Sequence, residues 1–150
     1  MNPETSNLLL AIGAIATPII SIIGFIFIFQ QINQTNKSLK TQIHSSIYKL
    51  VFDVNGIFID HPELRPYFYE SLPIKQGDND YNKVMNASEL LLDFFEYVIV
   101  EEAHMDDKIV AGWKVYMKKM FLKSPSLKLF LDENKDQYNK TFLSFIYIDM

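Results

Sequence analysis

The sequence contains no cysteine and only five glycines among 150 residues. Without cysteine there can be no disulfide framework, no thiolate zinc site and no cysteine nucleophile, and this absence fits a reducing compartment. The chain also lacks a Gly-x-Ser-x-Gly nucleophile elbow, a phosphate-binding glycine loop and a His-Glu-x-x-His pair. The sequence therefore carries no motif for these enzyme classes, and we predict no cofactor.

Basic residues are missing from the first 36 positions, and Arg65 is the only arginine. Residues 37–150 contain all 14 basic residues and 17 of the 18 acidic ones, so this part of the chain has a net charge of −3. A nucleic-acid surface needs a basic excess or a basic stripe. We therefore predict no nucleic-acid partner.

Charge is also absent from residues 8–29, where Thr17 and Ser21 are the only hydroxyl side chains. As a helix, these 22 residues would be about 33 Å long, and a hydrocarbon core is roughly 30 Å thick. A cleaved signal peptide is the alternative, but the preceding MNPETSN has no positive charge and no small-residue cleavage motif follows the run. The sequence predicts a retained transmembrane helix.

The first positive charges after this run are Lys37, Lys40 and Lys49. Because cytoplasmic flanks are enriched in lysine and arginine, we predict an N-terminus outside and a cytoplasmic C-terminal part at the inner membrane. The predicted domains are residues 1–30, tail and span, and residues 31–150, a cytoplasmic helical domain.

Small residues recur along the span at Gly13, Thr17 and Ser21, with Gly24 close to the same stripe. Small side chains let membrane helices approach closely, so this stripe is a candidate surface for association with another span. Small residues are also common in spans that do not associate.

Helical periodicity dominates the rest of the chain. A stripe of Leu39, Ile43, Ile47, Leu50, Val54 and Ile57 predicts that the membrane helix continues through a polar stalk. We expect further helices at 62–69, at 81 to about 103 with Asp80 as cap, at 107–123 and at 125–135. A loop should span 71–80, and the apolar tail should dock on the core. The predicted fold is all-α: one transmembrane helix continuing into a small helical bundle.

Several landmarks resemble one family. HPELRPYFYE (61–70), ELLLDFFEYVI (89–99), Trp113 and SPSLKLFLDENKDQY (124–138) are similar to an uncharacterised family of small bacterial membrane proteins with a single N-terminal span. The resemblance covers most of the chain through aromatic and proline landmarks. It implies a membrane-anchored helical domain and brings no activity or functional residues.

Glu101 and His104 form a Glu-x-x-His spacing, which would place a carboxylate and an imidazole on one helical face. Di-iron bundles use this spacing, but they need two copies and two further glutamates. One copy favours a polar helix end with an exposed histidine over a metal site.

Two other groups are candidates for partner contact. Arg65, with His61 and Tyr67, can hold a partner's carboxylate or stack on a ring. We favour a structural corner in which Arg65 pairs with an acid of the helix expected from 81 to about 103. Lys114, Lys118, Lys119 and Lys123 can contact anionic lipid or form a solvated face.

These observations favour a membrane-anchored accessory or interaction protein whose partners are the bilayer and another protein or a second copy. A first alternative is an oligomeric effector that permeabilises the membrane. A second is a metal-dependent enzyme using Glu101 and His104.

Overall fold

The structure, a computed structural model, describes residues 3–148, with the backbone alone for residues 5, 6 and 8–13. Within that range all regular elements are helical, which confirms the all-α prediction. The chain divides into two compact units, Met1–Thr41 and Gln42–Met150. The domain boundary predicted from the sequence, after residue 30, marks a change in polarity. The boundary after Thr41 reflects contacts within the chain.

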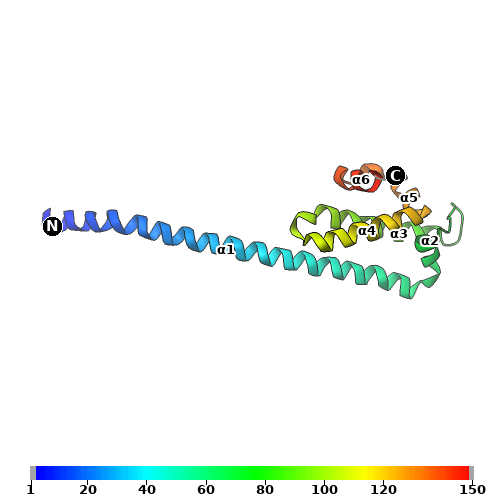
Figure 1. Cartoon of the computed structure of the whole chain (residues 1–150), viewed down its shortest axis with the longest axis horizontal. Coiled ribbons are helices and arrows are strands. Elements are labelled where there is room, and N and C mark those ends of the chain that lie inside the picture. Colours follow the sequence, from blue (N-terminus) through cyan, green and yellow to red (C-terminus); the bar gives the residue numbers. More distant parts are fainter. Residues whose placement is uncertain (1–2, 149–150) are drawn as a thin grey trace. The chain divides into compact units, whose positions relative to one another are not determined.

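The first helix, α1, is a single element of 58 residues, Pro3–Asp60, and continues through Pro18 (Figure 1). This confirms that the apolar run continues through the polar stalk as one helix. By length and composition, the part of α1 that begins at Ala14 is long and apolar enough to cross a membrane. Among the described residues, none of its most apolar stretch is buried.

The second half of α1 is the first helix of the bundle. Ile43, Ile47 and Val54 are buried, whereas Leu50 and Ile57 are half-buried against the core. The predicted stripe is therefore the core-facing side of α1. Leu39 is the exception, because it is exposed and belongs to the first unit.

Short helices connect the longer ones. After α1 come η1 (Pro62–Leu64) and α2 (Arg65–Tyr69), then the loop and α3 (Tyr81–Val100), followed by η2 (Glu102–His104), α4 (Asp107–Lys123), α5 (Pro125–Glu133), η3 (Lys135–Gln137) and α6 (Lys140–Tyr147). The helix expected at 62–69 is thus split at Arg65. Two others end early, at Val100 and Glu133, and each is followed by a 3-10 turn.

Side-chain caps explain several helix starts. The Asp106 carboxylate accepts from the Lys108 amide at 2.9 Å, and the Ser124 hydroxyl accepts from the Leu127 amide at 3.2 Å. Such caps satisfy amides that have no partner within the helix. Asp80 precedes α3 but makes no side-chain cap, contrary to expectation.

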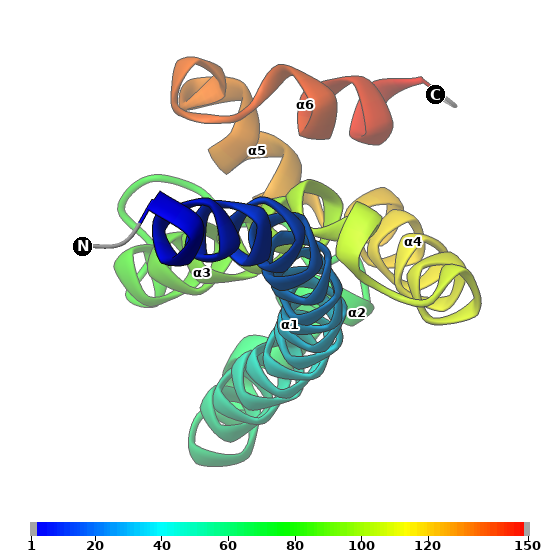
Figure 2. The same ribbon diagram turned by 90° about the vertical axis from the view of Figure 1, so that its left-hand side faces the viewer.

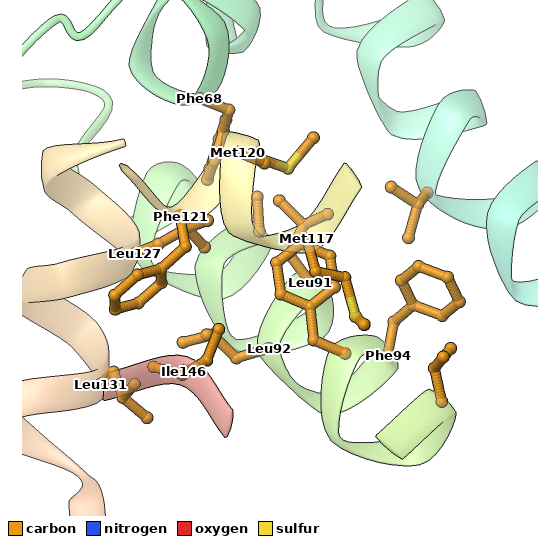
Figure 3. Close-up of a cluster of buried hydrophobic side chains, with 14 of the residues drawn as sticks. Phe68, Leu91, Leu92, Phe94, Met117, Met120, Phe121, Leu127, Leu131 and Ile146 are labelled. Atoms are coloured by element: carbon orange, nitrogen blue, oxygen red, sulfur yellow. The ribbon is translucent and has the colours of Figure 1, made fainter. Parts of the chain in front are cut away.

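The core of the second unit is built around α3, which contacts α4, α5 and α6. Figure 2 shows α5 and α6 together on one side of α3, with α4 beside it. The close-up in Figure 3 shows side chains from these helices and α2 meeting in one cluster, including Phe68, Leu92, Met117, Phe121, Leu127 and Leu131. Phe142 and Ile146 of α6 are buried, so the apolar tail docks as predicted.

Candidate functional site

The candidate association stripe lies on α1. The Ser21 hydroxyl donates to the Thr17 carbonyl at 2.9 Å, so this donor is used within the helix. At Gly24 an added Cβ would meet no atom within 4 Å. Gly13 lies in α1, and its surroundings fall outside the residues whose side chains are described. The stripe is thus exposed at Thr17 and Ser21 and open at Gly24.

The Arg65 side chain sits at the corner between α1 and α3. Its guanidinium carbon lies 4.6 Å from the centre of the Tyr69 ring, a cation–π geometry. The expected pairing with an acid of α3 is wrong, because Arg65 forms no ion pair with any residue in the described part of the chain. Since Tyr69 lies four residues further along α2, the helix itself brings the two side chains together.

Tyr69 links this corner to α4. Its hydroxyl lies 3.2 Å from that of Tyr116, and its ring packs edge-on against Phe58 at 5.7 Å. Burial, together with the hydrogen bond to Tyr69, raises the pKa of the Tyr116 hydroxyl. The corner therefore connects α1, α2 and α4 through aromatic contacts.

The other corner residues take part in local hydrogen bonds. The Tyr67 carbonyl accepts from the hydroxyls of Ser124 at 2.9 Å and Ser126 at 3.2 Å, both fully buried. The His61 imidazole lies 3.2 Å from the Glu63 carboxylate. The Lys83 ammonium group forms an ion pair with the same carboxylate at 3.5 Å. A backbone hydrogen bond, with help from these two side chains, lowers the pKa of Glu63.

Glu101 and His104 lie just beyond α3, in the turn formed by η2. The imidazole Nδ1 is 3.2 Å from the Glu101 carboxylate. Because α3 ends at Val100, the two residues do not share a regular α-helical face, contrary to expectation. No group of three or more metal-ligating side chains occurs among the described residues.

The four lysines of α4 fall into two pairs. Lys114 forms an ion pair with Glu102, and both Lys114 and Lys118 approach the Phe145 ring of α6, at 5.8 Å and 5.2 Å. Lys119 and Lys123 are exposed. The first pair thus helps to hold α6, and the second presents charge to the surroundings.

Two kinds of residue were missed by the sequence reading. The first kind is the buried pair of Ser124 and Ser126. The sequence indicates Ser124 as a helix cap, but nothing in it indicates the hydrogen bond to the Tyr67 carbonyl. Phe52 and Ile59 of α1 are 71% and 77% exposed. Both lie outside the stripe of Ile43, Ile47 and Val54, and that offset was the available signal.

Comparison with protein families, curated proteins and solved structures finds no match for this chain.

Proposed function

We propose that this chain is a single-pass membrane protein whose helical domain acts through protein contacts, as an accessory or scaffold subunit. The observation that carries the proposal is the apolar surface of α1. Phe25, Phe27 and Phe29 are each at least 66% exposed. Outside a membrane this surface would be exposed to water. Lipid would stabilise it, because removing apolar area from water is favourable by about 25 cal/mol per Å².

The orientation follows from the charges beside the span. Lys37 and Lys40 are the first basic side chains, and the segment before residue 8 contains only Glu4 as a charged residue. A span with this asymmetry places its lysine-bearing side in the cytoplasm. The helical domain would therefore be cytoplasmic, at the inner membrane, in agreement with the resemblance to small bacterial single-span proteins.

The role in protein contacts is supported by how the helical domain uses its polar groups. Arg65 stacks on Tyr69, His104 approaches Glu101, and the buried serines hold the Tyr67 carbonyl. Each of these groups takes part in a structural contact within the chain, whereas the exposed Phe52 and Ile59 leave apolar surface that another protein can cover.

Single-cysteine labelling of the full-length chain tests the anchoring. Asn7→Cys should react with a membrane-impermeant maleimide on intact cells, whereas Asn79→Cys should react only after permeabilisation. Because the chain has no native cysteine, each signal reports one position. The reverse pattern would overturn the orientation, and recovery in the soluble fraction would overturn the membrane span.

The interaction role needs a second measurement, the mass and composition of the complex after gentle extraction from the membrane. A complex of fixed stoichiometry supports the proposal, and a monomer at all concentrations counts against it. Dye leakage from liposomes containing the purified protein would favour the permeabilising effector instead.

A further inference from the structure

The outer face of α1 in the second unit is defined by Ser45, Phe52, Gly56 and Ile59. Among the described residues, its two large apolar side chains, Phe52 and Ile59, are 71% and 77% exposed. At about 100° per residue, Phe52 and Ile59 project roughly opposite to Ile47 and Val54, which face the core. Large apolar side chains with more than two thirds of their area exposed, one heptad apart on one helix, mark an interaction surface better than scattered ones do.

The spacing of this face is that of a coiled coil. Phe52 and Ile59 are seven residues apart, and Ser45 precedes Phe52 by seven. Ser45, Phe52 and Ile59 take the a position of a heptad, and Tyr48 and Asn55, three residues after the first two, take the d position. Tyr48 is 43% exposed, and its ring also packs edge-on against Trp113 of α4 at 6.5 Å. A seven-residue repeat keeps one side of a long helix against another helix.

Counting back in steps of seven extends the same sequence register along α1. The earlier a positions are Ser38, Gln31, Gly24 and Thr17, and the earlier d positions are Thr41, Gln34, Phe27 and Ile20. No charged residue occupies any a or d position between Thr17 and Asp60. Lys37, Lys40, Lys49, Asp53 and Asp60, the charged residues of this stretch, all occupy other heptad positions.

A charge-free seam fits an identical partner. In a parallel two-stranded coil each a residue meets its own copy, so a charge there would face a like charge. Copies anchored by one span with one orientation are necessarily parallel and share a high effective concentration. The polar a and d residues between Gln31 and Ser45 would fix the register.

Gly56 adds a second observation. An added Cβ at this position would meet no atom within 4 Å, so packing within the chain does not require glycine. Glycine in a helix interior costs about 1 kcal/mol relative to alanine. Glycine at this position, next to the d residue Asn55, lets the backbone of another helix approach closely.

We propose that the outer face of α1, centred on Phe52 and Ile59, binds a second copy of this chain as a parallel coiled coil. The inference deepens the proposed function and rests on it, because only membrane anchoring makes the copies parallel. The accessory domain is then presented as a pair.

Matched single cysteines in the full-length protein, oxidised in its own membrane, test the proposal. Ser45→Cys, Phe52→Cys and Ile59→Cys should form disulfide-linked dimers. Their neighbours Ser46→Cys, Asp53→Cys and Asp60→Cys are also exposed but project about 100° away, so they should cross-link at least tenfold less. Absence of cross-linking in the first set, or equal cross-linking in both sets, overturns the proposal.

A charge variant provides an independent readout. Phe52→Glu combined with Ile59→Glu should lower the dimer fraction at least tenfold, while Ser46→Glu, also an exposed position on α1, should leave it unchanged. Retained helicity by circular dichroism would show that the domain remains folded, because both replaced side chains are exposed. A dimer that persists in the double variant overturns the proposal. The maleimide labelling pattern is independent of these results, so loss of the dimer face would leave the membrane anchoring standing.

Discussion

At the residue scale, the hydroxyl of Tyr116 connects two helices that are far apart in the sequence. It lies 3.2 Å from the Tyr69 hydroxyl, and the Tyr116 ring packs edge-on against Trp113 at 5.7 Å. A phenol held in this way resists ionisation because its anion would be buried. Tyr138 is a second example, since burial and the neighbouring Asp93 carboxylate raise the pKa of its hydroxyl.

The raised pKa values of Tyr116 and Tyr138 predict that the folded protein loses stability in alkali. In the unfolded chain each ionises near its ordinary pKa of 10.0, whereas in the folded chain it stays protonated. Their contribution to the free energy of unfolding is therefore complete below pH 10. Above pH 10 it declines by at most about 1.4 kcal/mol per pH unit for each tyrosine. Tyr116→Phe should make the decline in the free energy of unfolding between pH 10 and 11 shallower.

The measurement is denaturant unfolding of the full-length protein in detergent at pH 7, 10 and 11. Tyr138→Phe should have the same effect on the slope, and the two changes together should add because the tyrosines do not contact each other. Equal slopes in the wild-type protein and both variants would contradict the prediction.

At the scale of elements, α6 shows how a short helix is held by tertiary contacts. Its eight residues are too few for a stable isolated helix. Phe142 and Ile146, four residues apart, are buried on one side, and the Asn139 side chain caps the start by accepting from the Thr141 amide at 2.8 Å. Helix formation and docking of α6 therefore depend on each other.

Phe142→Ala should consequently lower the free energy of unfolding by about 3–5 kcal/mol, the usual range for a buried phenylalanine. Ser144→Ala, an exposed change on the same helix, should shift it by less than about 0.5 kcal/mol. Both values come from denaturant unfolding of the full-length chain in detergent. A loss below 1 kcal/mol in Phe142→Ala would show that α6 is not part of the cooperative core.

At the scale of the whole molecule, the sequence and structure describe one helix with two environments. Ile19 and Ile23 of α1 are about half exposed, and no other part of the chain that the structure describes buries the most apolar stretch. Further along the same helix, Ile47 is buried in the bundle. The membrane anchoring that we propose and the folding of the domain would thus be encoded by different stretches of a single element.

Charge placed in the span should weaken membrane insertion. Ile19→Lys near the middle of residues 8–29 should cost about 2.5–3.5 kcal/mol, and Ile19→Lys with Ile23→Lys more. The fraction of protein that stays with membranes after an alkaline carbonate wash reports this change. Asn36→Lys, the same charge outside the predicted span, is the control. Full retention of the double variant would contradict the transmembrane assignment.

The sequence by itself determined the all-helical fold, the continuous first helix, most helix starts and the core-facing stripe in the second half of α1. These features depend on local periodicity, caps and proline positions, which act over a few residues. It also limited the candidate chemistry, because cysteine and the common catalytic motifs are missing.

Only the tertiary structure decided which polar groups meet. Arg65 stacks on Tyr69 instead of pairing with an acid, Glu102 pairs with Lys114 across two helices, and two buried serines hold the Tyr67 carbonyl. Such contacts depend on distances between elements far apart in the chain, which periodicity does not contain. The same reason explains Phe52 and Ile59: a helix shows several apolar stripes in sequence, and packing alone decides which of them is left uncovered.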